Sequence, residues 1–466
     1  MEMVEEMKMI DLADVKAFYQ QNKTALLEEL KAFLSIPSIS TDPKYAGEVE
    51  KAALLLSNLL SKHGADHVQI LPTKGHPIVY ADYLVDDNLP TVLVYGHYDV
   101  QPPEPIEKWT NPPFEPTIRN GRIYARGACD DKGQLFIHLV VLAYLKSIDY
   151  PCNIKFLFEG EEEVGSVSLE AFIQDHLTLL KADLVLISDT AILGEEQPSI
   201  ISGTKGILYF ELTASGPKKD IHSGIYGGGV QNPMNAISHA IHSIKPIGDQ
   251  IQIPGFYDDV ILPKDTEMDV ESYHFYNDAL KEELGVSDFI SDPNWTSTQT
   301  TYFMPTFDVH GMWGGYMQDG AKTIIPHSAS AKCSFRLSPG QSPQKVKQQL
   351  EQFIASLEVP GITFSIEELS ACEPSFIDHQ SNAFQAASLA MLETFGKAPV
   401  QTRMGGSLPI VPMIQNLLKA EVVLLGFGTD EDNIHSPDEN FKLNLFEKGI
   451  ETVALFHKKL HLLDRS

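Results

Sequence analysis

The amino-acid sequence predicts an α/β protein whose largely parallel sheet is interrupted by a smaller α+β domain. Short apolar runs alternate with helical stretches up to Ile187, the pattern changes around Gly203–Gly206, and the alternation resumes after Phe376. A chain of 466 residues also exceeds one ordinary core, so two or three domains are expected. We therefore expect one α/β domain in two parts, residues 1–204 and 374–466, around an inserted domain at residues 205–373.

The first part of the chain should begin with two helices. Apolar residues recur at helical spacing from Leu12 to Phe33, and a second helix around Val49–Lys62 ends near Gly64, a residue type that often ends helices. The apolar runs that follow have the length of buried strands: Pro77–Leu84, Thr91–Tyr95, Ile154–Phe158 and Leu184–Ile187. Helical stretches separate the later runs: Gln134–Lys146 and Leu169–His176. This alternation predicts a sheet with both faces covered by helices.

The inserted domain should be a small α+β sandwich. Its expected elements alternate as strand, helix, strand, helix and strand: Ile207–Ala214, Pro233–Ile244, Ser330–Leu337, Pro343–Leu357 and Ile362–Leu369. A long insertion near Pro254–Pro305 interrupts them. The α/β pattern then resumes with a helix, a strand and a long closing helix: Asn382–Phe395, Val422–Phe427 and Phe441–Leu462.

The charge balance is strongly acidic, with 35 Lys and Arg against 63 Asp and Glu and a net charge of −28. Nucleic-acid phosphates and anionic lipid are therefore excluded as expected partners. No apolar run approaches the roughly 20 residues that span a bilayer, and the acidic start lacks the pattern of a signal peptide. The four Cys residues form no C-x-x-C pair, which argues against a disulfide-stapled fold and a thiolate zinc site. We expect a cytoplasmic protein.

Five clusters of acidic or imidazole side chains each follow a predicted strand. They contain His97 and Asp99, Asp130 and Asp131, Glu159–Glu163, Asp189, and Asp432–His435. Taken singly, each has a simpler explanation as a polar turn, a helix cap or a solvated run of charge. Because ligands gather beyond the carboxyl ends of strands in an open α/β sheet, the set predicts one site at that edge. Nitrogen and oxygen donors without thiolates suit a two-metal hydrolytic site.

Motifs along nearly the whole chain resemble those of one known family. In order they are GHYDVQP, RIYARGACDDKG, EEVGS, ISD, KDIHSGIYGG, AKTIIP, FRLSP and GGSLP, followed by the late His435. In this series the sequence resembles the M20 metallopeptidases, and within them the cytosolic non-specific dipeptidase and carnosinase group. The resemblance implies a metallodipeptidase with a zinc-peptidase-like catalytic domain and an inserted ferredoxin-like lid that also forms the dimer.

The resemblance also implies two divalent metal ions per subunit, zinc in the first place, with manganese or cobalt as alternatives. Asp130 looks like the carboxylate that bridges the two ions. His97 and Asp189 would complete the protein ligands of one ion, and Glu163 and His435 those of the other.

Glu162 resembles the general base of the family, which takes a proton from the metal-bridging water. The x-Gly-Ser that follows sets the register of the three consecutive glutamates and leaves Glu161 without a role. Asp99 is similar to the acid that orients His97. Members of the family also hold a cis peptide bond after the bridging aspartate, here Asp130–Asp131.

In the inserted domain, His222 resembles a histidine that reaches the partner subunit's site in a homodimer and stabilises the oxyanion there. A second set looks like a clamp for the substrate carboxylate: Arg336, Thr323, Gly406 and Ser407. Arginine suits this task because its planar fork binds a carboxylate bidentately. One departure is His327, which follows AKTIIP where related eukaryotic dipeptidases have Arg or Lys, and substrate preference could shift there.

Other functions are open on the sequence alone. Within the same family, the chain could be an N-acyl amino acid deacylase, a desuccinylase or a carboxypeptidase. An inactive relative that only binds metal is the main alternative of another class, but it would typically lack Glu162 or one of the metal ligands, all of which are present. A two-metal phosphatase is also chemically conceivable. The preferred dipeptide, the physiological metal, the state of the lid and the reason for the surplus negative charge are not specified by the sequence.

Overall fold

The computed structural model describes residues 10–261, 278–290 and 294–463. The chain forms two compact units. The first comprises Met1–Ser202, Ile377–Gln401 and Met413–Ser466, and the second comprises Gly203–Phe376 and Thr402–Pro412. In the residues described, no helix is both long and apolar enough to cross a membrane.

A mixed sheet lies at the centre of the first unit, where the sequence predicted a sheet. Its strands follow the order β1-β2-β6-β3-β7-β17-β8. These strands are β1 (Asp66–Leu71), β2 (Ile78–Tyr83), β6 (Asn153–Glu159), β3 (Thr91–His97), β7 (Leu184–Ile187), β17 (Glu421–Leu424) and β8 (Ser199–Thr204). The parallel part is narrower than expected, since only β6, β3, β7 and β17 run parallel while the flanking strands pair antiparallel. The short connection between β1 and β2 allows only a hairpin, whereas parallel pairs need longer crossovers.

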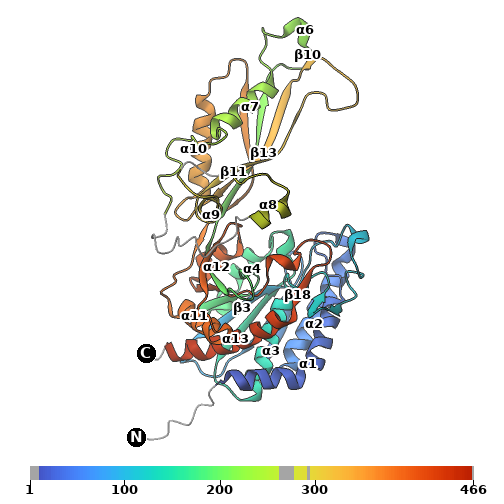
Figure 1. Ribbon diagram of the computed structural model, residues 1–466, viewed down its shortest axis with the longest axis vertical. Helices are drawn as coiled ribbons and strands as arrows, with labels where there is room; N and C mark the ends of the chain where they lie inside the picture. Colours follow the sequence, from blue (N-terminus) through green and yellow to red (C-terminus); the bar gives the residue numbers. More distant parts are fainter. Residues whose placement is uncertain (1–9, 262–277, 291–293, 464–466) are drawn as a thin grey trace. The chain divides into compact units, whose positions relative to one another are not determined.

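Helices supply the crossovers and cover this sheet. They are α1 (Leu12–Leu34), α2 (Ala46–Lys62), α3 (Lys132–Ser147), α4 (Leu169–Asp175), α5 (Leu177–Leu180), α11 (Asn382–Phe395), α12 (Ile410–Leu418) and α13 (Leu443–Leu463). Helix α3 is buried on nearly all sides and packs against α13, which also packs against α11 (Figure 1). A separate three-stranded sheet contains β4 (Thr117–Arg119), β5 (Arg122–Tyr124) and β18 (Asn440–Lys442).

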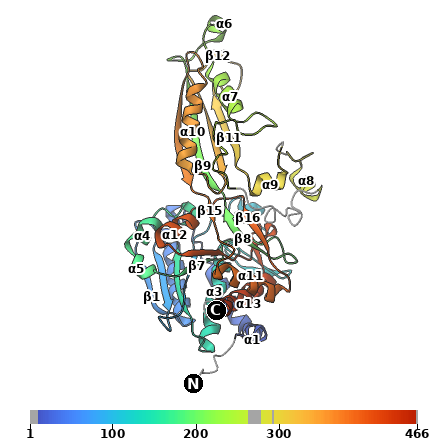
Figure 2. The same ribbon diagram turned by 90° about the vertical axis from the view of Figure 1, so that its left-hand side faces the viewer.

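The second unit contains a four-stranded antiparallel sheet in the order β11-β13-β9-β14. Along the chain its elements follow a β-α-β-β-α-β pattern: β9 (Gly206–Ser215), α7 (Pro233–Ile244), β11 (Thr306–Gly314), β13 (Ser328–Leu337), α10 (Pro343–Ser356) and β14 (Thr363–Cys372). This is the element order of a ferredoxin-like fold. Helix α10 lies along β9 and β14 (Figure 2).

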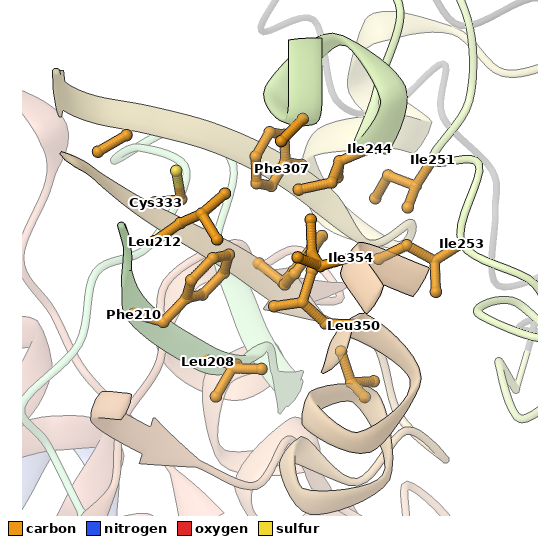
Figure 3. Close-up of a cluster of buried hydrophobic side chains, with 14 of the residues drawn as sticks. Leu208, Phe210, Leu212, Ile244, Ile251, Ile253, Phe307, Cys333, Leu350 and Ile354 are labelled. Atoms are coloured by element: carbon orange, nitrogen blue, oxygen red, sulfur yellow. The ribbon is translucent and has the colours of Figure 1, made fainter. Parts of the chain in front are cut away.

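The core of the second unit lies between its sheet and its two long helices. The sequence predicted β9, α7, β13, α10 and β14 close to these positions, because their apolar residues keep a regular period. Figure 3 shows buried side chains of these elements and of β11 in one cluster that includes Phe210, Leu212, Ile244, Phe307, Cys333, Leu350 and Ile354. Strand β11 was not expected. It is an edge strand with a register shift between Val309 and Gly311, which breaks its alternation.

Several short elements complete the second unit. They are β10 (Ile221–His222), α6 (Ser223–Tyr226), α8 (Asp278–Leu284), α9 (Ser297–Tyr302), β12 (Ile324–Ile325) and β15 (Ser375–Phe376), with β16 (Val400–Met404) at the boundary between the units. The expected insertion at Pro254–Pro305 contains α8 and α9, but residues 262–277 and 291–293 lie outside the described part of the chain.

Candidate metal centre

The parallel register of the first unit brings the carboxyl ends of its central strands to one edge. His97, the last residue of β3, pairs with Glu159 at the end of β6, and Ile187 ends the adjacent strand β7. The segments that leave this edge carry the side chains predicted for the site. Glu162 and Glu163 begin a short 3-10 helix directly after β6, and Asp189 follows β7.

Two triads of potential ligands form at this edge, and they share Asp130. His97, Asp130 and Asp189 offer ligand atoms within 4.8 Å of one another, and so do Asp130, Glu163 and His435. The Nε2 atom of His97 lies 3.0 Å from Oδ1 of Asp130 and 3.6 Å from Oδ2 of Asp189. The Nε2 atom of His435 lies 2.9 Å from the other Asp130 oxygen, Oδ2, and 3.3 Å from Oε2 of Glu163.

The donor set fits a pair of divalent cations. Burial, followed by the charge of Asp130, raises the pKa of Asp189 well above its usual range. Burial also raises the pKa of Glu162 to about 8, and Asp189 and Glu163 add to this effect. So many carboxylates in a buried space need compensating positive charge, and the mixture of imidazole and carboxylate donors suits zinc and similar ions.

Asp99 connects the imidazole of His97 to the backbone of Glu162 and Glu163. Its Oδ1 lies 3.3 Å from Nδ1 of His97, and its two oxygens accept the backbone N–H groups of Glu162 and Glu163. The side chains of His97 and Asp99 are both fully buried. This network fixes one ring nitrogen of His97 and leaves the other directed at Asp130 and Asp189. The peptide bond between Asp130 and Asp131 is cis, as expected.

The residues predicted to bind substrate fall into two separate groups within the second unit. Nη1 of Arg336 donates to Oγ of Ser407 at 3.0 Å, and the backbone oxygen of Gly406 accepts the N–H of Lys205. Thr323 lies elsewhere, because its carbonyl oxygen accepts the N–H of Ser223, the residue after His222.

Strand β13 separates these two groups. His222 pairs with Ile324 of β12, which directly precedes the start of β13 at Ser328, whereas Arg336 is near the other end of that strand. The stretch from Ser328 to Arg336 spans roughly 26 Å at about 3.3 Å per residue. The structure therefore places Thr323 with His222 rather than with Arg336.

His327 forms a contact near this end of the second unit. Its Nδ1 lies 2.8 Å from Oδ1 of Asp220, which also accepts the backbone N–H of His327. Because both side chains are largely exposed, this is a surface contact that holds the short pair β10 and β12 to the start of β13.

Sequence reasoning missed three residues that contact this centre. Nε2 of Gln101 donates to Oε2 of Glu163 at 2.8 Å, and Oγ of Ser40 donates to Oδ2 of Asp99 at 2.6 Å. Glu439 accepts the backbone N–H of Asp130. Gln101 lies within the GHYDVQP motif and Glu439 follows His435 closely, so both had a positional signal, whereas Ser40 had none.

Known proteins resemble this chain over most of its length. The profile of Peptidase family M20/M25/M40 matches residues 93–459. Cys-Gly metallodipeptidase dug1 of Schizosaccharomyces pombe is 32% identical, over 94% of this chain and 96% of its own length. Beta-Ala-His dipeptidase of Mus musculus is 30% identical, over 82% of this chain and 80% of its own length.

A solved structure is also similar over almost the whole chain. The M20 family metallo-carboxypeptidase of Sulfolobus solfataricus has a TM-score of 0.81 and 33% identity, and the match covers 94% of this chain and 99% of that one. The family profile spans most of the sequence, and the curated relatives match over most of their own lengths. The chain therefore belongs to peptidase family M20/M25/M40.

Proposed function

We propose that this metallopeptidase hydrolyses the peptide bond of dipeptides with two divalent metal ions and with Glu162 as its general base. The observation that carries the proposal is the shared carboxylate of Asp130, which belongs to two triads of nitrogen and oxygen donors at one sheet edge. Both curated relatives named above are dipeptidases, which supports the substrate class.

In this proposal Asp130, His97 and Asp189 would hold one ion, and Asp130, Glu163 and His435 would hold the other. Asp130 would thus be shared by both sites. When bound, the ions supply a Lewis acid and lower the pKa of water. Zinc is proposed as the metal, although the same donors also accept manganese or cobalt.

Glu162 moves the proton in the proposed reaction. It takes a proton from the attacking water and delivers it to the leaving amine. A pKa of about 8 keeps much of this carboxyl protonated near neutral pH in the metal-free chain. Positive charge beside it would lower that pKa and release the base. Asp99 acts as a positioning residue, because it holds both His97 and the backbone of Glu162.

The inserted domain, residues 205–373, is proposed to act as a lid and to form a homodimer. Arg336, Gly406 and Ser407 would bind the substrate carboxylate. His222 would donate to the oxyanion in the partner's site. Its Nδ1 accepts the N–H of Gly224 at 2.9 Å, so in the neutral ring the proton lies on Nε2, where it can be donated.

The separation along β13 supports the dimer. Because His222 and Thr323 lie roughly 26 Å from Arg336 along the strand, the two groups cannot contact one dipeptide from the same subunit. We therefore propose that Thr323 acts with His222 on the partner's substrate. A cytoplasmic location is also proposed, because all four cysteines are free and buried rather than paired in disulfides.

Replacement of Glu162 by Gln tests the base directly. The E162Q variant should still bind two metal ions but lose about 10²–10⁴-fold in hydrolysis of Cys-Gly and β-Ala-His. Turnover and bound metal are measured on the same sample, with E161Q as the control because Glu161 has no proposed role. Near-normal turnover by E162Q would overturn the assignment.

A carboxypeptidase is the second candidate, because the similar solved structure bears that name. The two activities differ in their need for a free amino terminus. A dipeptidase should cleave free dipeptides and leave N-acylated ones intact, whereas a carboxypeptidase should accept N-acylated peptides. Initial rates on matched free and N-acetylated substrates, with an aryl phosphate ester included to test for phosphatase activity, decide between them.

A further inference from the structure

We propose that Glu439 is a positioning residue that holds Asp130 in place and thereby sets the metal affinity of both triads together. The inference rests on the proposed two-metal function. Glu439 is neither one of the predicted ligands nor near the proposed base in sequence. Its role would be to fix the backbone from which the shared ligand projects.

The carboxylate of Glu439 accepts four hydrogen bonds from one short segment. Its Oε1 accepts the backbone N–H groups of Cys129 at 3.0 Å and Asp130 at 3.1 Å. Its Oε2 accepts the N–H of Gly127 at 3.0 Å and Nη1 of Arg126 at 2.7 Å. The side chain is 1% exposed, so water does not replace any of these partners. The turn before α3 is thus organised around one carboxylate.

The chemistry of this arrangement needs a carboxylate. All four groups that face Glu439 are donors, and a carboxylate is the side chain that only accepts. A glutamine of the same shape would turn its NH₂ group toward at least one N–H and leave buried donors without partners. Each such loss costs about 1–3 kcal/mol. The turn would then relax, and Asp130 would move with it.

Glu439 connects the segment that contains His435 to the turn that contains Asp130. It follows His435 in the segment that leads into β18, and the backbone oxygen of Glu439 also accepts the N–H of Ala125. One segment therefore supplies the potential ligand His435 and, through Glu439, stabilises the turn that supplies the shared residue Asp130. Because Asp130 belongs to both triads, any displacement of its backbone affects both at once.

A change at Glu439 should therefore alter the affinities of both metal sites together. E439Q should weaken both metal sites by a similar factor, about 10–100-fold, which is the usual effect of losing a group that orients a ligand. Variants of the unshared ligands, D189N and H435N, should each weaken mainly one site. A purely structural role for Glu439 would lower stability without this joint change in affinity.

The experiment measures zinc binding to the metal-free full-length chain by competition with a chromophoric chelator. Free energy of unfolding is measured in parallel, in chelator. D438N is the matched control, because Asp438 is the adjacent residue, also loses a carboxylate charge in this variant, and contacts Thr110 and Arg119 rather than the turn. Its two affinities should equal those of the unsubstituted chain. If E439Q leaves either site unchanged, or if D438N weakens both equally, the proposal is overturned.

A second variant covers the case in which E439Q does not fold. Loss of one partner leaves the charge of Arg126 buried and unpaired, which is strongly destabilising, whereas replacing both partners is often tolerated. The double variant R126M/E439Q should therefore fold and show the same joint loss of affinity. Wild-type affinities in this variant would overturn the proposal. Since no substrate is present, these outcomes are independent of whether the enzyme hydrolyses dipeptides.

Discussion

The metal-centre edge and the element that carries His222 are built in contrasting ways. At the edge, His97 ends a buried strand and contacts Asp99. Asp130 projects from a turn that is hydrogen-bonded to Glu439. His222 lies on a strand of two residues, and the adjacent Ile225 and Tyr226 are exposed apolar side chains. The potential metal ligands are thus fixed by their own unit, while the proposed oxyanion donor has few stabilising contacts in its unit. We infer that a partner subunit supplies what this element lacks.

Removal of the His222 imidazole should have a large effect on activity. H222A should lower kcat by about 10²–10³-fold, as expected for one oxyanion donor, with metal content unchanged. Mixed with inactive E162A, it should recover activity, because a hybrid dimer contains one site with both residues intact.

The rate expected for the mixture of H222A and E162A can also be calculated. If subunits exchange freely, half of the dimers are hybrids with one active site in two, so the mixture should reach about a quarter of the unsubstituted rate. Rates are measured after co-refolding or long incubation. Recovery that is absent while hybrid dimers are demonstrably present would mean that His222 acts within its own subunit.

Metal removal should act on one region only. A ligand present at 100 times its dissociation constant stabilises a site by about 2.7 kcal/mol, so chelation should lower the free energy of unfolding of the first unit by about this amount per ion. Amide hydrogen exchange should accelerate at the start of α3 and around His435, and stay unchanged in β10 and β12. Equal changes in both regions would show that metal binding also orders the element that carries His222.

The convergence of ligands could be predicted from sequence because it depends on local patterns. Runs such as Thr91–Tyr95 and Leu184–Ile187 are apolar throughout, which is typical of buried parallel strands, and the residues after them must share an edge. Thr323 was grouped with Arg336 because nothing in the local sequence tells which end of a strand a distant loop will reach. Ser40 was missed for the same reason, since its contact with Asp99 joins segments far apart in the chain.

Acid should weaken the first unit through two core histidines. Burial lowers the pKa of His457 to about 4 and that of His138 to about 3, with His457 also contributing to the second shift. In the unfolded chain both imidazoles would titrate near 6.5, so between these values the unfolded state binds more protons and stability falls as pH falls. Each histidine should cost about 2 kcal/mol between pH 7 and pH 5.

The variant H457Q isolates one of these contributions. Glutamine does not titrate, so the loss of stability between pH 7 and pH 5 should be about 2 kcal/mol smaller than in the unsubstituted chain. Denaturant unfolding at the two pH values, with chelator throughout to exclude metal release, gives the difference. An unchanged pH dependence would show that His457 is not held neutral by the core.

The smallest effect is expected at His327. Its contact with Asp220 is exposed, and exposed contacts between charged groups contribute little to stability. H327R, which introduces the residue type that the family resemblance implies here, should leave the free energy of unfolding nearly unchanged. Steady-state kinetics on a dipeptide panel should show shifts in KM rather than in kcat. A large drop in kcat would mean that this contact positions His222 more firmly than its exposure suggests.

The unequal exposure of His97 and His435 should determine how fast each proposed ion exchanges with the medium. The His97 side chain is 0% exposed, whereas that of His435 is 52% exposed. In the proposed two-metal centre, an ion held through His435 would meet water and small chelators without rearrangement of the first unit, while release past His97 would require buried groups to move. The ion on the His435 side should thus be the labile one, whose identity follows the surrounding divalent cations. The ion on the His97 side should instead keep the identity that it had when the chain folded around it.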